Sequence, residues 1–204
     1  MRVFNKFGRA LAAATVMMLA VPASGQQSFS DSYNFLKAVK ERDGAKVTDL
    51  VGEPSTGMVV INTRERGTGE GALHIVVRGR DLNWLAFLLG KGARPDIQSN
   101  RGETPLTLAA QIGWVEGAEE LLARRASVDL ANGRGETPLI LATQRRDLAM
   151  VRLLLARRAD PKRTDNVAGM SALDYAKQDP RAAAVLKLLE AKAGPARPSA
   201  GPTK

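Results

Sequence analysis

Apolar residues in this chain gather in short segments that come in pairs. Leu106, Leu108 and Ala109 form one narrow apolar stripe, and Leu121 and Leu122 close a second stripe in the same pair. Such spacings place apolar side chains on one side of a helix, so each segment predicts a short amphipathic helix. One pair is too small to bury its apolar sides, and we therefore expect the pairs to stack on one another.

The pairs return at a fixed interval along the chain. The segment 102–109 (GETPLTLA) recurs 33 residues later at 135–142 (GETPLILA), and looser copies stand at 69–76 and 169–176. Each copy is followed by a second apolar segment that ends in a leucine pair. A period of this length is typical of a solenoid, in which each unit packs only against its neighbours.

The starts of the first helices carry local signals. Thr104, Thr137 and Ser171 stand where a side-chain oxygen accepts a hydrogen bond from a free backbone N–H group of the first helical turn. Pro105 and Pro138 come directly after two of them, at the first helical position, where no N–H donor is needed and φ is already helical. These residues predict helix starts at the same place in successive units.

The repeat resembles the unit of the ankyrin-repeat family, which begins its first helix with G-x-T-P-L-H-x-A and follows its second with L-L-x-x-G-A-D-x-N. The resemblance covers residues 66–191 and implies an all-α solenoid of helix–turn–helix units with short hairpin loops between repeats. Residues 31–62 fit more loosely as an N-terminal capping repeat, and residues 26–62 are interpreted as N-terminal capping helices and a linker. The resemblance predicts ankyrin repeats at 66–98, 99–131 and 132–164, and a C-terminal capping repeat at 165–191.

Two departures from the family pattern bear on stability. The glycine that ends the second helix is kept at Gly92 but replaced by Arg125 and Arg158. A residue other than glycine in a left-handed cap costs about 1 kcal/mol, so these two turns are either weaker or built differently. The family histidine is kept only at His74, which we expect to brace neighbouring repeats through hydrogen bonds.

The two ends of the chain differ from the repeats. Arg2, Lys6 and Arg9 precede an apolar run at 10–21, and small residues follow at 22–25, which is the pattern of a secretory signal peptide spanning 1–25. The run is shorter than the roughly 20 apolar residues of a membrane-spanning helix. We therefore expect cleavage, a periplasmic or secreted protein and no transmembrane segment in the mature chain; the alternative is an uncleaved N-terminal anchor. The stretch 192–204, rich in Pro, Gly, Ala and Ser, is expected to be disordered.

Charge narrows the class of partner. The chain has 30 Lys and Arg against 21 Asp and Glu, a net charge of +9, and loss of residues 1–25 would leave +6. A basic surface suits acidic proteins, anionic lipid head groups or cell-wall polymers, whereas nucleic acid is not expected outside the cytoplasm. The plainer alternative is that the basic side chains are simply spread over a solvated surface.

Candidate chemistry is sparse. The chain has no cysteine and one histidine, so it lacks the residues for disulfides, thiolate metal sites or clusters of histidine ligands. The glycines at 67–71 lack the lysine and the strand–turn–helix setting of a phosphate-binding loop. We therefore expect no enzymatic activity, no cofactor and no metal.

Candidate binding residues follow from the resemblance. Ankyrin arrays bind through the hairpin tips between repeats and the groove-facing ends of the first helices. The corresponding residues here are Asn100, Arg101, Glu103, Arg134 and Glu136 at the tips, and Arg78, Gln111, Ile112, Gln144 and Arg145 at the helix ends.

The two tryptophans receive different interpretations. Trp114 stands beside Ile112, after Gly113, at a position that is usually polar in the family, which indicates an exposed contact residue at the groove rim. The alternative is that Trp114 packs over the neighbouring repeat. Trp84 lies within an apolar run and is expected in the core.

These features predict an exported, periplasmic module that binds a protein partner as a scaffold or regulator. The basic charge allows an acidic partner, and capped ankyrin stacks usually stand as monomers, so the resemblance implies a monomer. The alternative is a basic cell-envelope protein that binds anionic lipid or a cell-wall polymer.

Overall fold

The computed structural model describes the backbone of residues 24–52 and 57–193, with side chains from residue 31 onward. This part of the chain is helical, with isolated bridges in place of strands, so the expected all-α class is confirmed. The helices are α1 (Ser24–Glu41), α2 (Gly44–Gly52), α3 (Gly57–Ile61), α4 (Ala72–Arg78), α5 (Leu82–Gly90), α6 (Pro105–Ile112), α7 (Val115–Ala123), α8 (Pro138–Gln144), α9 (Leu148–Ala156), α10 (Ala172–Gln178) and α11 (Ala183–Ala193), with a 3-10 turn at Pro180–Ala182.

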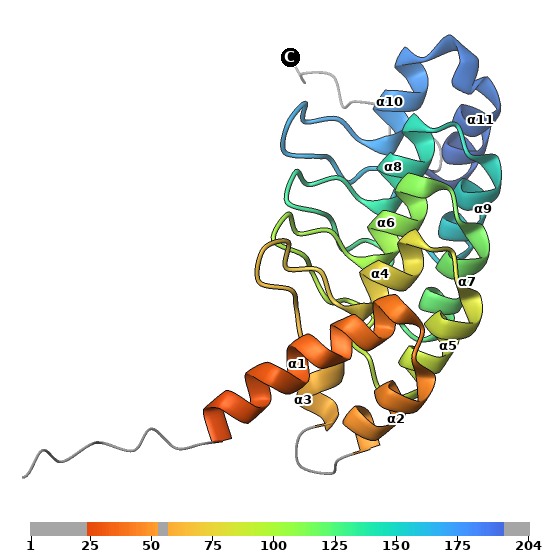
Figure 1. Ribbon diagram of the computed structural model, residues 1–204. Helices are drawn as coiled ribbons and strands as arrows, with labels where there is room; N and C mark the ends of the chain where they lie inside the picture. Colours follow the sequence, from red (N-terminus) through yellow and green to blue (C-terminus); the bar gives the residue numbers. More distant parts are fainter. Residues whose placement is uncertain (1–23, 53–56, 194–204) are drawn as a thin grey trace, which may run out of the picture.

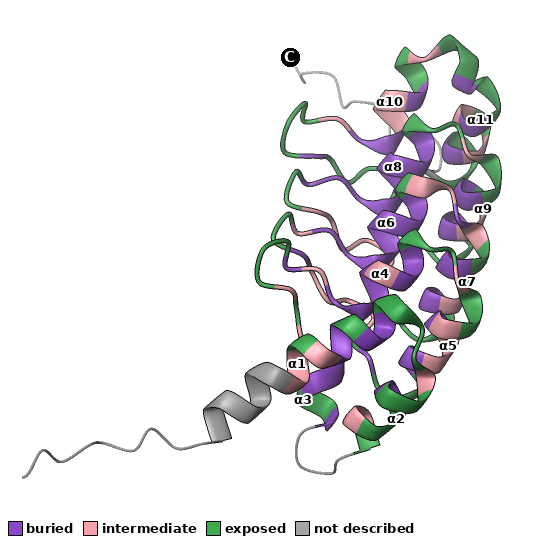
Figure 2. Ribbon diagram, in the orientation of Figure 1, coloured by how far each residue is buried: buried purple, intermediate pink, exposed green. Residues whose placement is uncertain are grey.

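The helices stack in two columns (Figure 1). The first helices α4, α6, α8 and α10 form one column, the second helices α5, α7, α9 and α11 form the other, and the hairpin loops project to one side of the first column. Buried residues follow the contact between the columns along the whole stack (Figure 2). Leu85, Leu121 and Leu154 of successive second helices are fully buried there, so each unit shares its apolar layer with its neighbours.

The first helices begin as their sequences predict. The Thr104 hydroxyl accepts a hydrogen bond from the backbone N–H of Thr107, and Pro105 occupies the first helical turn. Thr137 caps α8 and Ser171 caps α10 in the same way. Since the cap fixes where each helix leaves the hairpin, it also fixes how the hairpins line up along the stack.

The turns after the second helices keep the left-handed cap even without glycine. Arg125 has φ 65° and Arg158 has φ 67°, at the positions equivalent to Gly92 with φ 95°. This settles the alternative left open by the sequence: the turns are built in the usual way and carry the backbone strain of a left-handed residue with a Cβ.

Hydrogen bonds between repeats tie the hairpins into one ridge. At each tip a backbone N–H donates to a carbonyl oxygen of the preceding tip, at 2.9 Å in all three cases. Because a whole row of tips is bonded in register, the ridge presents its side chains at regular intervals. The donors are the amides of Asn100, Gly133 and Asn166, and the acceptors are the carbonyls of Thr68, Arg101 and Arg134 respectively.

The N-terminal end differs from the repeats. Helix α1 has 18 residues, whereas the first helices α4, α6 and α8 have 7 or 8, and it crosses the end of the stack and extends past it (Figure 1). Helix α3 occupies a stretch that sequence reasoning had taken as part of a linker, and it buries Val60 and Ile61.

The expected signal peptide and C-terminal tail lie almost entirely outside the described residues. Helix α1 is described from Ser24, and α11 ends at Ala193. None of the described helices is long and apolar enough to cross a membrane.

Candidate functional site

Residues of two successive hairpin tips and of helix α4 line an open hollow of about 530 Å³. Three of the residues predicted to bind a partner, Arg78, Asn100 and Arg101, line it together. Glu70, Thr68 and Gly67 of the preceding hairpin complete its wall. The structure thus brings tip residues of two successive hairpins and a helix-end residue to one place.

Close backbone contacts hold these tips. Gly102 has φ 70°, and a Cβ there would lie 2.6 Å from the backbone nitrogen of Gly133 in the next tip, so only glycine fits. Within the same tip, the Ser99 hydroxyl accepts hydrogen bonds from the backbone N–H groups of Arg101 and Glu103. The tip therefore has little freedom to change shape when a partner binds.

A row of glutamates lies beneath the arginines of this face. The Arg101 guanidinium is 3.0 Å from the Glu103 carboxylate, and Arg134 is 3.8 Å from the carboxylate of Glu136. Arg78 pairs closely with Glu70 and lies 3.9 Å from Glu103.

The two partners of these ion pairs differ in exposure. The side chains of Arg78, Arg101 and Arg134 are 44%, 71% and 67% exposed, whereas those of Glu70, Glu103 and Glu136 are 17%, 11% and 11% exposed. A partner approaching this face meets guanidinium groups, because the carboxylates lie below them. A guanidinium has five N–H donors, so donors remain for a second carboxylate.

This arrangement corrects one set of predictions. Glu103 and Glu136 were expected as contact residues, but both are buried. Their backbone N–H groups are fixed by Ser99 and Asn132, and their carboxylates hold the arginines above them. They therefore support the arginines from below and leave little carboxylate surface exposed.

Two further predicted residues continue the row of helix ends. Gln111 and Gln144 stand 33 and 66 residues after Arg78, at equivalent positions of α6 and α8, and both are exposed. Helices α4, α6 and α8 thus carry one exposed guanidinium and two exposed amides near their C-terminal ends, which adds neutral donors and acceptors to the arginines.

Ile112 and Arg145 do not line the hollow. They lie at the turns that lead from the first to the second helices, where Arg80 donates a hydrogen bond to the Ile112 carbonyl. The Arg145 guanidinium lies against Gly113 in the same row of turns. These contacts are with other turn residues, so the prediction that grouped Ile112 and Arg145 with the tips is not supported by their positions.

Trp114 is the clearest correction. It was expected as an exposed residue at the groove rim, but it is 5% exposed and belongs to the core. Its ring lies over Gly117, one helical turn further on, where the missing side chain leaves room for it. Trp114 is therefore buried, as the alternative of packing over the neighbouring repeat expected, although the contact seen here is with Gly117 of its own repeat.

Trp84 was expected in the core, and this prediction is also wrong in part. Its side chain is half-buried. The Arg42 guanidinium lies 5.6 Å from the ring centroid, and the Phe87 ring meets the indole edge-on, also at 5.6 Å. The apolar residues of the short helix α5 are therefore not all buried, because those on one side of the helix lie at the surface.

His74 serves the structure, as its resemblance to the family histidine predicted. Its Nδ1 accepts a hydrogen bond from the Gly71 N–H, and its Nε2 lies 2.9 Å from the Glu103 carbonyl oxygen, to which it donates. Burial lowers the pKa of His74, although the bond to Glu103 opposes this effect. The described residues hold no group of three or more His, Cys, Asp or Glu side chains arranged to bind a metal.

Sequence reasoning missed Glu70 and Thr68. Glu70 stands 33 residues before Glu103, so the repeat register could have identified it as a tip residue. The signal for Glu70 is weak because the first copy of the repeat motif has Gly71 and Ala72 in place of the Thr-Pro pair.

Comparison with known families agrees with this architecture. A family model described as ankyrin repeats (3 copies) matches residues 73–165 and 118–197. The two matches overlap, and together they span more than half of the 204 residues.

Proposed function

This chain belongs to the ankyrin-repeat family, whose repeats generally mediate protein–protein interaction, and we propose that it is an exported module that holds or regulates an acidic protein partner. The partner binds at the face formed by the hairpin tips and first helices. One observation carries the proposal: Arg78, Arg101 and Arg134 are exposed, whereas among the carboxylates paired with them Glu103 and Glu136 are buried and Glu70 is largely covered.

A protein is the class of partner that suits this face best. The basic groups are spaced by the repeat and lie along a ridge. A site for a small ligand would instead have polar side chains of the protein that converge on one point. Their pairing with largely covered carboxylates holds the guanidinium groups in place before binding, which lowers the entropic cost of ordering them.

The proposal of export is supported by the N-terminal residues. Cleavage before Gln26 would remove only two residues of α1, Ser24 and Gly25, and the buried core described here begins further on at Phe35. Mass spectrometry of the protein from its native cells tests this: an N-terminus near Gln26 supports export, and recovery of the intact N-terminal segment contradicts cleavage.

Affinity measurements test the proposed face. We expect R101A/R134A to bind the isolated partner about tenfold or more weakly, since each arginine offers charge-assisted hydrogen bonds at an interface. Both side chains are mostly exposed, so the stability of the free protein should change little. Arg152→Ala on α9, also exposed, is the matched control and should bind normally. Equal affinity of R101A/R134A and the unchanged protein would contradict the proposal.

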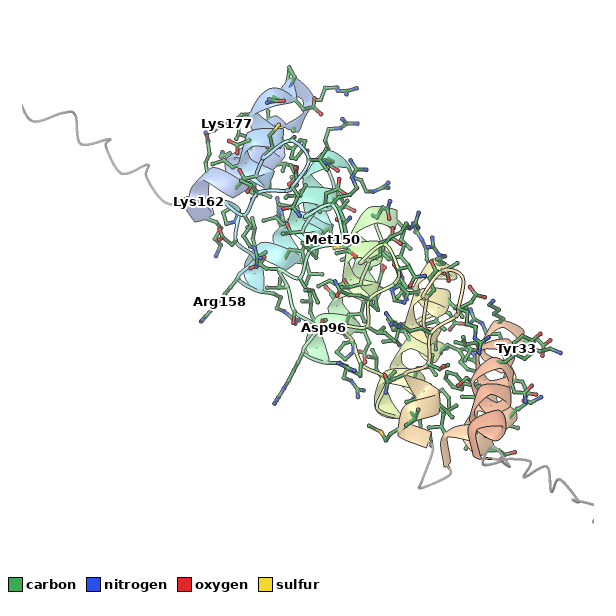
Figure 3. The ribbon with its side chains drawn as sticks, turned by 90° about the vertical axis from the view of Figure 1, so that its left-hand side faces the viewer. Tyr33, Asp96, Met150, Arg158, Lys162 and Lys177 are labelled. Carbon is green, nitrogen blue, oxygen red and sulfur yellow. The ribbon has the colours of Figure 1, made fainter. Side chains whose placement is uncertain are left out.

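A second candidate function is association with the cell envelope through basic charge. A row of exposed basic residues at the ends of the second helices favours it: Arg125, Arg157, Arg158 and Lys162 form no ion pair within the described part of the chain, and Arg158 points away from the stack (Figure 3). Salt-sensitive binding of the protein to anionic vesicles, lost in R157A/R158A, would support this candidate. Absence of binding at low salt would exclude it.

A further inference from the structure

A second cavity lies outside the repeats, between helix α1 and the hairpin that precedes α4. Its volume is about 780 Å³, which is within the range of natural ligand sites. The residues that matter for its chemistry are Tyr33, Leu36, Lys37, Lys40, Arg64 and Arg66.

We propose that this cavity is a second recognition site that takes an acidic peptide segment of the partner protein. The inference rests on the proposed function, because it assigns part of the same partner to a site that the repeats do not form. Below, this site is called the α1 pocket.

Apolar contact in the α1 pocket comes from α1 itself. Leu36 is buried at its base, and Tyr33 is 70% exposed. Tyr33 is the one aromatic residue among the large apolar side chains that are exposed in the described part of the chain, and it lies at the end of the stack (Figure 3). An exposed tyrosine offers a rigid apolar surface and a hydroxyl, which makes it a common anchor at protein interfaces.

The charges of the α1 pocket are unbalanced. Glu65 is the one carboxylate among the described residues that line it, and it already accepts hydrogen bonds from Lys40, at 2.9 Å, and from the Thr68 hydroxyl, at 2.8 Å. Lys37 forms an exposed ion pair with Glu41, at 3.8 Å, and such an exposed pair contributes little to stability. The Arg64 guanidinium is fixed by its hydrogen bond to the Gln98 carbonyl, at 3.0 Å. The remaining basic charge suits carboxylates supplied by a partner.

The α1 pocket adjoins the hollow between the hairpin tips, because Gly67 lines both cavities. A partner segment that lies in extended form against Tyr33 can therefore pass over the first tip towards Arg78 and Arg101. This adjacency favours a peptide over a free small anion, which would occupy only one of the two cavities.

The α1 pocket lies outside the part of the chain that the family model matches. All its lining residues lie at 32–67, before the family match begins at residue 73. Its wall comes from the long helix α1, whose 18 residues exceed the 7 or 8 of the other first helices. The family resemblance therefore gives no account of it, whereas a site for one specific partner does.

Fluorescence anisotropy with the full chain tests the assignment. The probe is a short fluorescein-labelled peptide of alternating Glu and Leu, and the comparison probe has Gln in place of Glu. We expect saturable binding of the Glu peptide, about tenfold weaker binding of the Gln peptide, and losses of about threefold to tenfold in Tyr33→Ala and in Lys37→Ala. Met58→Ala, exposed to a similar extent on α3, is the control and should bind the Glu peptide normally.

The outcomes separate this inference from the proposed function. No saturable binding of the Glu peptide, or equal affinities for Tyr33→Ala and the unchanged chain, would overturn the α1 pocket even if R101A/R134A loses the partner. Weaker peptide binding by Tyr33→Ala, together with normal partner binding by R101A/R134A, would support the α1 pocket. The same result would overturn the proposed binding face at the hairpin tips and first helices.

Discussion

The indole ring of Trp114 occupies the space that a side chain at residue 117 would fill. A Cβ placed on Gly117 would lie 2.1 Å from Cε3 of the ring, far inside contact distance. The equivalent pairs in the flanking repeats are Asp81 with Trp84 and Asp147 with Met150, in which the aspartate caps the second helix. Helix α7 lacks a side-chain cap, and the ring of Trp114 replaces the bulky residue one turn later.

A double-mutant cycle should show that Trp114 and Gly117 depend on each other. Trp114→Asp alone should cost about 3–5 kcal/mol because it empties a buried site. Gly117→Met alone should cost about 1–3 kcal/mol because the new side chain meets the ring. The double variant restores the pattern of the flanking repeats, and its loss should fall short of the sum by about 1–3 kcal/mol. Urea denaturation of the unchanged protein and the three variants measures these losses of unfolding free energy. Strictly additive losses would show that the ring and the glycine are independent.

Glycine at the two strained turns should stabilise the array. Arg125→Gly and Arg158→Gly should each raise the free energy of unfolding by about 0.5–1 kcal/mol, since both residues are left-handed and glycine has no Cβ to clash there. Arg152→Gly, within α9, is the control and should lower it by about 1 kcal/mol. Unchanged or lower denaturation midpoints for both turn variants would mean that strain at these turns is negligible.

Stability should fall on mild acidification because of His74. Burial lowers its pKa in the folded protein below the value of about 6.5 in the unfolded chain. The unfolded state then binds the proton first, so stability is complete above pH about 6.5 and decreases as the pH falls below it, by at most about 1.4 kcal/mol per pH unit. Urea midpoints between pH 7.5 and 5.5 measure this.

The same titration has a specific control. His74 is the only histidine of the chain, and His74→Gln should remove the pH dependence in that range. It should also lower stability at every pH, because the hydrogen bonds to Gly71 and Glu103 change. An unchanged pH dependence in His74→Gln would assign the effect to other groups.

Local signals predicted local structure, and features that depend on neighbouring repeats were harder to read. Thr104 and Pro105 identify a helix start by themselves. The constant spacing of the repeat predicts that the hairpin tips lie side by side along the stack. The burial of Trp114 depends on the absence of a side chain at Gly117, and the burial of Glu103 depends on Arg78 and Arg101 folding over it. Those relationships arise only when the units are packed.

The N-terminal end was the least predictable part for the same physical reason. Tyr33 and Leu36 lie outside the repeat, so the repeat pattern does not predict which residues lie opposite them. Only the packing of α1 against the hairpin at 63–67 reveals a cavity there.

Site-specific photo-crosslinking in cells that natively produce the protein tests the central claim most directly. A photoreactive residue at Gln111 or Gln144 would lie beside the hairpin tips, and one at Glu119 or Arg152 would lie on the second helices; all four positions are exposed. The account predicts a defined cross-linked protein partner from Gln111 and Gln144 and none from Glu119 and Arg152. Cross-links from the second helices alone would contradict it.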